Sequence, residues 1–294
     1  MHPTPKMNPV PKGDFTSRPE KILHHEMFSW RHKREKKVSS DARQLKVLTW
    51  NIFFGDDKKI RHPKLLDIVH SEDPDIICFQ EVTQDFVNLL MSQAWVRDHY
   101  FVADLSNAWP ACWYGVMVLS KKRPAKVFRQ LLPTRQGRSL LAFEFLINGK
   151  SFVVSTIHLE SMDNDRDIRK AQMGIIFDQI GSSSSSILCG DCNFGDGPEN
   201  EEIPHAYVDA WRVLHKTDDP DPKLALGHTF DHEKNPLIPF PITRRLDRVF
   251  LRSSEWEVVG MKMLGEESFK VEEKKTWPSD HWGLSCIIRS NASS

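Results

Sequence analysis

The sequence predicts an α/β protein in which two packed β-sheets are covered on the outside by helices. Apolar, β-branched segments typical of buried strands alternate with segments whose apolar residues recur at helical spacing. Some neighbouring strand patterns are separated by a tight turn and others by a helix, so the chain combines hairpins with crossover connections. With 294 residues, of which 39% are apolar, the chain can bury a large core.

Strands and helices are predicted in alternation from Leu45 onward. Asn148-Gly149 stands between two strand patterns and is a strong hairpin signal. Residues 194–243 follow neither period and are expected to be largely irregular. Helices are predicted at residues 62–74, near 84–95 and at 165–180. Strands are predicted at 45–54, 75–81, 115–121, 140–146, 151–159, 186–191, 244–252 and 281–289.

The first 40 residues differ in composition from the rest of the chain. They hold four prolines within eleven positions and nine Lys and Arg against four Asp and Glu, so we expect a basic, partly disordered extension. Its RHKREKK run (31–37) fits a nuclear address, a weak nucleic-acid patch or a solvated charge run. The segment 22–30 is expected to form a short helix that docks on the body. Residues 41–294 are expected to form one domain.

Charge and hydropathy exclude several classes of protein. Residues 41–294 carry 31 basic against 36 acidic side chains, so the body does not have the basic excess of a protein that grips long DNA. A nucleic-acid substrate would be held over a short footprint or at an end. No apolar run reaches the roughly 20 residues of a membrane-spanning helix, and no secretory signal is evident at the N-terminus. We therefore expect an intracellular protein with reduced cysteines.

Six predicted strands carry small polar clusters at their ends, which is where open α/β sheets hold ligands. Each residue alone has a structural alternative, such as a strand cap or a hydrogen-bonded core histidine. Carboxylates in one pocket repel each other unless a cation offsets them, and oxygen ligands suit Mg²⁺ or Mn²⁺. The clusters are Trp50-Asn51, Gln80-Glu81, His158 with Glu160 and Ser161, Asp191 with Asn193, Asp247, and Asp280-His281.

The stretch CGDCNF (189–194) permits two interpretations. Cys189 and Cys192 have the spacing of a redox pair or of half a zinc site, whereas Asp191 and Asn193 suit phosphate chemistry. A redox pair normally opens a helix, and zinc needs a second ligand pair that the remaining cysteines do not supply. The pattern favours Asp191 and Asn193 as the functional residues and the cysteines as packing residues, with the thiol interpretations as alternatives.

Six motifs, taken in order, resemble the endonuclease/exonuclease/phosphatase superfamily and, within it, the tyrosyl-DNA phosphodiesterases. The resemblance runs from Leu45 to Ile288 and implies a DNase I-like, four-layer α/β sandwich of two mixed β-sheets. Two positions depart from the family pattern: Gly195 replaces an arginine that reaches toward the substrate phosphate, and Phe230 replaces a tryptophan beside the nucleic acid. The motifs are T-W-N (49–51), Q-E (80–81), H-L-E-S (158–161), G-D-x-N (190–193), R-x-D-R (245–248) and S-D-H (279–281).

The resemblance implies a division of labour among these residues. Glu81 would bind Mg²⁺, or alternatively Mn²⁺, with Asn51 and Asp280 completing the shell of the ion. Asp191 would orient and deprotonate the attacking water, and Asn193 would hold that water or a phosphate oxygen. His158 and His281 would donate to the phosphoryl oxygens, with Asp247 accepting from His281. The residues expected to contact substrate are Ser161, Trp50, Phe230 and Arg248.

The function implied is that of a metal-dependent phosphodiesterase in DNA repair. It would hydrolyse the 5′-phosphotyrosyl-DNA bond left by a trapped topoisomerase II and leave a 5′-phosphate. The expected partners are DNA ends with a 5′-tyrosyl adduct, single-stranded or with a short overhang, with RNA as an alternative. We expect a monomer without membrane contact, in the nucleus and also the cytoplasm. The alternatives are another phosphoester hydrolase (nuclease, deadenylase or phosphatase) and a non-catalytic scaffold on this fold.

Overall fold

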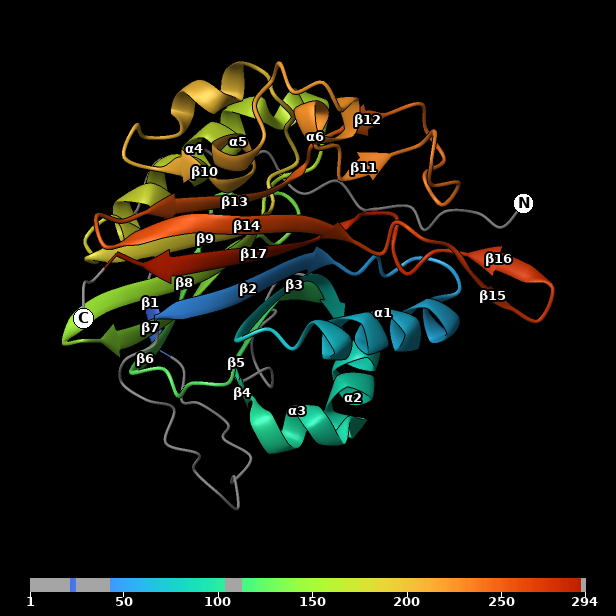
Figure 1. The fold of residues 1–294 in the computed structure, drawn as a ribbon, viewed down its shortest axis with the longest axis horizontal. Coiled ribbons are helices and arrows are strands. Elements are labelled where there is room, and N and C mark those ends of the chain that lie inside the picture. The colour runs from blue at the N-terminus through green and yellow to red at the C-terminus, as the bar shows by residue number, and fades with distance from the viewer. Residues whose placement is uncertain (1–21, 25–42, 104–112, 292–294) are drawn as a thin grey trace.

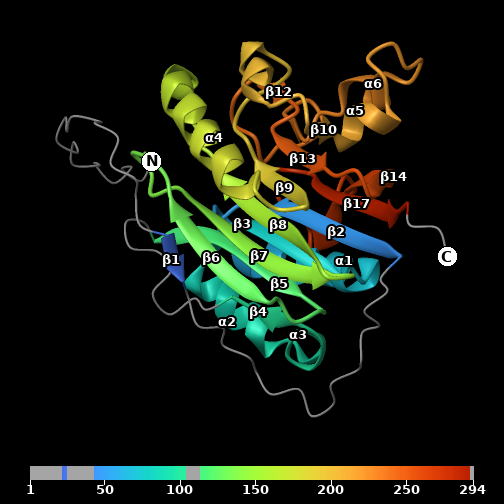
Figure 2. The same cartoon turned by 90° about the vertical axis from the view of Figure 1, so that its left-hand side faces the viewer.

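Two β-sheets pack face to face between two layers of helices, as the computed structural model shows for residues 22–24, 43–103 and 113–291. Figure 1 places the long helices on opposite sides of the paired sheets, and Figure 2 shows the same layers after a quarter turn. The predicted four-layer α/β sandwich is therefore confirmed. Among the described residues, no helix is both long and apolar enough to cross a membrane.

One sheet contains seven strands in the order β1-β6-β7-β8-β9-β13-β10. Its pairs are antiparallel except for the parallel pair β8–β9, so the sheet is mixed. The predicted hairpin at Asn148-Gly149 joins β7 to β8. The strands are β1 (Ile22–His24), β6 (Lys126–Leu131), β7 (Ser139–Ile147), β8 (Lys150–His158), β9 (Ser185–Asp191), β13 (Asp247–Arg252) and β10 (Val208–Asp209).

The second sheet contains six strands in the order β14-β17-β2-β3-β5-β4, and here β2–β3 is the parallel pair. Two small hairpins, β11–β12 and β15–β16, stand outside the two sheets. The six strands are β14 (Trp256–Leu264), β17 (Gly283–Ser290), β2 (Gln44–Asn51), β3 (Ile76–Thr83), β5 (Tyr114–Ser120) and β4 (Phe101–Val102). The hairpin strands are β11 (Phe230–Asp231), β12 (Thr243–Arg244), β15 (Phe269–Val271) and β16 (Lys274–Thr276).

Helices cover the outer face of each sheet. Leu65 of α1 and Phe86 of α2 pack on Leu48 of the six-stranded sheet. Ile176 of α4 packs on Leu188 of the seven-stranded sheet. The helices are α1 (Lys58–Glu72), α2 (Gln84–Ser92), α3 (Ala94–His99), α4 (Arg166–Ile180), α5 (Ala210–Leu214) and α6 (Pro222–Leu226), with the 3-10 helices η1 (Asp163–Asp165) and η2 (Pro198–Glu202).

The two-residue period of the strands separates the cysteines of the CGDCNF stretch. Cys189 faces the core between the two sheets, and Cys192 packs in the core between the seven-stranded sheet and α4. Both thiols are free and buried, and burial raises the pKa of Cys192 above its ordinary value. Two thiols in different cores form neither a redox pair nor half a zinc site, so the packing interpretation is correct.

The structure also corrects the secondary-structure prediction at several points. The helix expected at residues 22–30 is wrong at its start, because Ile22–His24 forms strand β1 against β6, while residues 25–30 lie outside the described part of the chain. Strands β6 and β14 were not predicted, because KVFRQL and WEVVGMKML mix charged residues into the apolar pattern. Their backbone pairing with neighbouring strands outweighs that weak local signal.

Candidate active site

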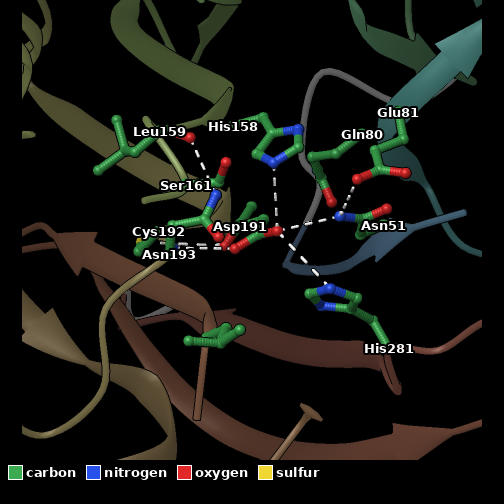
Figure 3. A network of polar contacts seen from close by, with 12 residues as sticks. Asn51, Gln80, Glu81, His158, Leu159, Ser161, Asp191, Cys192, Asn193 and His281 are labelled. Carbon is green, nitrogen blue, oxygen red and sulfur yellow. Dashed lines mark hydrogen bonds and ion pairs between the residues drawn. The ribbon is translucent and has the colours of Figure 1, made fainter. Parts of the chain in front are cut away.

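Strands of both sheets deliver polar residues to one place. In the parallel pair β2–β3, Asn51 lies opposite Gln80, and in the parallel pair β8–β9, His158 lies opposite Asp191. Asp247 at the start of β13 is also a register partner of Asp191. Because the two parallel pairs end at the same edge of the sandwich, the carboxyl ends of their strands form one polar cluster, as Figure 3 shows.

Asp191 occupies the centre of this cluster. Its Oδ2 accepts a hydrogen bond from Asn51 Nδ2 at 2.9 Å and lies 3.4 Å from His158 Nε2 and 3.8 Å from His281 Nε2. Its Oδ1 accepts from the backbone N–H of Asn193 at 2.9 Å. The side chain is almost fully buried, so these donors fix the direction of both carboxylate oxygens.

His158 is held in one tautomer by a cation. Arg138 Nη1 donates to His158 Nδ1 over 3.0 Å, and because a guanidinium only donates, the ring proton must lie on Nε2, which faces Asp191. Burial and the Arg138 charge together lower the pKa of His158 well below its ordinary value. His158 is therefore a neutral hydrogen-bond donor.

His281, in contrast to His158, is held in its protonated, cationic form. Its Nδ1 donates to Asp247 Oδ2 over 2.8 Å, while its Nε2 faces Asp191. Burial disfavours the charged ring, but the carboxylates of Asp247 and Asp191 outweigh burial and raise the pKa of His281 well above its ordinary value. The site thus presents one neutral and one cationic imidazole to the same carboxylate.

Glu81 is turned into the site by a bulge in β3. The register of β3 against β5 shifts between Phe79 and Val82, and Glu81 has a left-handed backbone with φ of 59°. Its carboxylate accepts from the backbone N–H of Phe54 at 3.2 Å and from Asn51 Nδ2 at 3.3 Å. Asn51 therefore joins Glu81 to Asp191 through one amide nitrogen, while its side-chain oxygen accepts from the backbone N–H of Phe53.

Glu81 and Asp280 form an acidic pair at this end of the cluster. Burial, followed by the charge of Asp280, raises the pKa of Glu81 to about 7. Burial likewise raises the pKa of Asp280 to about 6, although the charges of His281 and Arg61 act against it. Arg61 fixes the surrounding backbone, because its guanidinium donates to the carbonyls of Phe53, Gly55, Asp56 and Pro278.

Two places in the site can hold a divalent cation. Asp191, Asp247 and His281 offer ligand atoms within 4.8 Å of one another, but the His281 ring is already bound to Asp247 and carries a proton on each nitrogen when cationic. Glu81 and Asp280 offer carboxylate oxygens, and neither forms an ion pair within the part of the chain that the structure describes. Gln80 Oε1 is buried, has no hydrogen-bond partner among the described residues and lies beside Asn51 (Figure 3). The oxygen-rich side fits a hard ion such as Mg²⁺ better.

The loops after β8 and β9 carry Ser161 and Asn193. Asn193 Nδ2 donates to the backbone oxygen of Leu159 at 2.9 Å, which fastens the two loops together. Ser161 Oγ donates to Gln136 Oε1 at 2.9 Å, and Gln136 Oε1 also accepts from Arg138. Ser161 thus lies at the rim, within the network that holds His158.

A glycine makes the central pairing possible. Gly190 lies opposite Ile157 in β8, and a Cβ at Gly190 would lie 2.1 Å from the carbonyl oxygen of Ile157. Its φ of 132° is also strained for other residues. A side chain at position 190 would push apart the two strands that bring His158 to Asp191.

Two residues that were expected to contact the substrate are buried and are not exposed to it. Trp50 is fully buried in the core under α1, and its indole N–H donates to the backbone oxygen of His281. Arg248 is buried as well and is paired with Asp209 and Asp196. Both support the site from beneath, so the structure corrects that prediction. Phe230 packs against the His281 ring, with centroids 4.8 Å apart, and is mostly buried.

Arg138, Gln136 and an aromatic cluster beside Glu81 belong to the site although no sequence motif marks them. Phe54 and Tyr114 both contact Trp113, whose side chain is 60% exposed, and Tyr114 lies near His158. These residues belong to loops and strand ends without a motif of their own. The sequence carries no signal for them, because the exposure of Trp113 and its place beside the site become visible only in the fold; an exposed tryptophan there can act as a base-stacking platform.

Comparisons with known proteins agree with this geometry. The model of the Endonuclease/Exonuclease/phosphatase family matches residues 48–281. Tyrosyl-DNA phosphodiesterase 2 of Rattus norvegicus is 26% identical over 262 residues, which cover 84% of this chain and 68% of the relative. The Homo sapiens protein of the same name is 25% identical over 258 residues, covering 82% of this chain and 67% of the relative.

Solved structures share the fold. D. rerio TDP2 complexed with single strand DNA product superposes with a TM-score of 0.68 at 23% identity, over 84% of this chain and 99% of that one. The human Nocturnin catalytic domain with bound sulfate superposes with a TM-score of 0.65 at 17% identity, over 94% of this chain and all of that one. The family match spans more than half of the sequence and every cluster of the site. The chain therefore belongs to the endonuclease/exonuclease/phosphatase family.

Proposed function

We propose that this protein is a Mg²⁺-dependent phosphodiesterase that hydrolyses 5′-phosphotyrosyl-DNA bonds and leaves a 5′-phosphate, as in DNA repair. The observation that carries the proposal is the arrangement around Asp191, in which a fixed carboxylate stands between a neutral and a cationic imidazole. The resemblance to proteins named tyrosyl-DNA phosphodiesterase 2 supports the substrate class. A phenolic leaving group, with a pKa near 10, also departs more readily than a sugar alkoxide.

Glu81 and Asp280 are the residues that would hold the ion. Burial is the main cause of their raised pKa values, and the nearby charges of His281 and, for Asp280, of Arg61 offset it only in part; a bound divalent cation would favour the ionised carboxylates further. Asn51 would keep Glu81 and Asp191 in register through its amide nitrogen. When bound, the ion would supply Lewis-acid stabilisation of charge on the phosphate and the leaving oxygen.

Asp191 is the general base in this proposal. A water aligned by Asp191 and Asn193 would lose its proton to the carboxylate as it attacks phosphorus. Asn51 and the two imidazoles fix the orientation of Asp191, so little reorganisation is needed during attack.

The two histidines would stabilise charge on the phosphoryl oxygens. His281, held protonated by Asp247, would contribute a cationic donor, and His158, held by Arg138, a neutral N–H. Ser161 and Phe230 lie at the margins of the same site, where Ser161 would add a hydroxyl donor and Phe230 an apolar face. Together these donors favour a trigonal bipyramidal phosphorus over the ground-state diester.

A panel of oligonucleotides tests the proposal. The substrates are a single strand with a 5′-phosphotyrosine, its RNA counterpart, the same DNA with an ordinary 5′ end, and a 5′-phosphorylated strand, each with Mg²⁺, with Mn²⁺ and without metal. Release of tyrosine from the DNA adduct alone, with a 5′-phosphate as product, is the expected result. Internal cleavage or loss of a terminal phosphate would instead identify a nuclease, deadenylase or phosphatase of the family. No turnover of any substrate would favour a binding protein.

The cellular location and oligomeric state stay predictions. The basic run at 31–37, on which nuclear localisation rests, lies outside the described residues. Imaging of the full chain against a variant with that run neutralised tests the location, and sedimentation of the purified protein tests the monomer.

A further inference from the structure

Arg244 lies where the loop after β9 meets the loop after β8. The chain at 244–246 runs beside the loop after Asp191, since Cys192 N–H donates to the backbone oxygen of Leu246. From β12, the Arg244 side chain crosses to η1, where its Nη1 donates to Asp163 Oδ1 at 2.8 Å. Arg244 thus bridges the two loops that also carry Asn193 and Ser161.

The stem of Arg244 lies beside Gly195 at van der Waals distance. A Cβ at Gly195 would lie 3.8 Å from Arg244 Cγ and 3.9 Å from its Cβ and Cδ. These are ordinary contact distances, so the bare glycine gives the arginine stem a surface to lie on. A side chain at 195 would therefore begin next to the stem of Arg244.

The guanidinium of Arg244 is held only by a solvent-exposed ion pair among the contacts described for it. Its side chain is 41% exposed and that of its partner Asp163 is 76% exposed, and an ion pair this open to water contributes little stability. Arg138 and Arg245 are less available, since Arg138 is buried against His158 and Arg245 is buried between Asp196 and Asp209. Among these three, Arg244 alone can exchange its carboxylate partner for a substrate anion.

The position of Arg244 indicates which anion of the substrate it would bind. Figure 3 shows Ser161 and Asn193 on one side of Asp191 and Glu81 on the other, and Arg244 contacts the loops beyond Ser161 and Asn193. The scissile phosphate at Asp191 would therefore lie between the Glu81–Asp280 pair and Arg244. Arg244 would contact the nucleic-acid strand at a phosphate further from the bond that is cleaved. The planar guanidinium matches a phosphodiester in a bidentate geometry.

We propose that Arg244 binds an internucleotide phosphate of the substrate strand, one or two nucleotides from the bond that is cleaved. The proposal rests on the proposed phosphodiesterase function and makes Arg244 a determinant of substrate length. A tyrosyl mononucleotide lacks this phosphate and gains nothing from Arg244. A tyrosyl oligonucleotide gains affinity, which appears in KM rather than in kcat.

Steady-state kinetics of Arg244→Ala on both substrates test the proposal. With a 5′-tyrosyl tetranucleotide, KM is expected to rise roughly tenfold with kcat unchanged, as for loss of one charge-assisted hydrogen bond. With the 5′-tyrosyl mononucleotide, neither constant changes. The matched control is Lys170→Ala, which removes an exposed, ion-paired cation from α4 and should affect neither substrate. Equal loss on both substrates, or no loss on either, would overturn the proposal.

Two further variants separate a phosphate contact from a structural role. Asp163→Asn removes the competing carboxylate and is expected to lower KM for the tetranucleotide only. Gly195→Arg combined with Arg244→Ala supplies a guanidinium from the residue next to the Arg244 stem and should restore most of the lost affinity. Failure of both variants to move KM in these directions contradicts the assignment.

A direct binding measurement makes the test of Arg244 independent of catalysis. If the unmutated protein cleaves neither tyrosyl substrate, the proposed function fails, and fluorescence anisotropy with a labelled 5′-phosphorylated tetranucleotide then tests Arg244 alone. Arg244→Ala is expected to weaken that binding roughly tenfold and to reduce its salt slope by about 0.7, the value for one phosphate contact on a single strand. An unchanged affinity and slope would overturn the assignment.

Discussion

His158 and His281 approach the same carboxylate oxygen of Asp191, with Nε2 atoms 3.4 and 3.8 Å from it, and their surroundings shift their pKa values in opposite directions. The difference comes from the partner of each Nδ1, which is the Arg138 guanidinium for His158 and the Asp247 carboxylate for His281. One ring can therefore supply a charge to a phosphoryl oxygen while the other supplies a neutral donor.

Asp247→Asn should lower kcat by roughly 10- to 100-fold with little change in KM, because Asp247 orients His281 and keeps it protonated. The carboxylate raises the pKa of His281, so its removal lowers that pKa and moves the alkaline limb of the pH–rate profile to lower pH. Asp75→Asn, which alters a carboxylate at the start of β3, is the control and should leave the profile in place. An unshifted alkaline limb in Asp247→Asn would contradict the role given to Asp247.

Glu81→Gln should stabilise the metal-free protein at pH 8. The folded-state pKa of Glu81 is raised from 4.5 to about 7, so the folded protein binds the proton more tightly and loses stability as the pH rises from about 4.5 through 7. Glutamine removes that penalty, which is on the order of 1–3 kcal/mol at pH 8 and vanishes near pH 4.

Thermal unfolding at pH 4 and pH 8, with and without Mg²⁺, measures both effects of Glu81→Gln. At pH 8 the unmutated protein should gain stability from Mg²⁺ because the ion binds the folded state, and Glu81→Gln should gain almost none. A metal response that survives in Glu81→Gln and disappears in His281→Gln would place the ion at Asp191, Asp247 and His281 instead.

Gly190→Ala should destabilise the fold by about 2–4 kcal/mol or prevent folding. Its Cβ would overlap the carbonyl oxygen of Ile157, and the φ of 132° is strained for alanine. Gly174→Ala is the matched control, because no atom lies within 4 Å of its Cβ in helix α4 and alanine should stabilise that helix by about 0.5–1 kcal/mol. Chemical denaturation of both variants checks the difference in sign.

Cys189→Ala and Cys192→Ala should retain activity, apart from modest losses of stability from the smaller side chains. The two thiols lie in different cores, so a redox or zinc mechanism has no geometric basis. Rates measured with and without a thiol reductant should coincide. Loss of turnover in both variants, with folding intact, would reopen the thiol interpretation.

Much of the fold follows from local sequence patterns. The long strands β2, β8 and β9 and the helix α4 were predicted to within a few residues, because each buries an apolar face with a clear period. Strand β14 was not predicted because its mixed sequence gives no clear strand pattern. Its stability comes from pairing with β17.

The site was predictable in its motifs but not in its geometry. The bulge that turns Glu81 inward depends on the pairing of β3 with β5, which no local pattern reports. Arg138 lies just before β7, 20 positions before His158, and no motif marks it. Trp50 and Arg248 carry motif positions but lie beneath the site, since sequence order does not reveal which face of a strand end is covered.

The measurement that tests the account most directly is tyrosine release from a 5′-phosphotyrosyl oligonucleotide by the unmutated protein and by Asp191→Asn, each with and without Mg²⁺. We expect release only with metal, a 5′-phosphate product, and a rate lower by roughly 10²- to 10⁴-fold in Asp191→Asn, as for loss of a general base. Release that is independent of Mg²⁺, or that proceeds at an unchanged rate in Asp191→Asn, would contradict it.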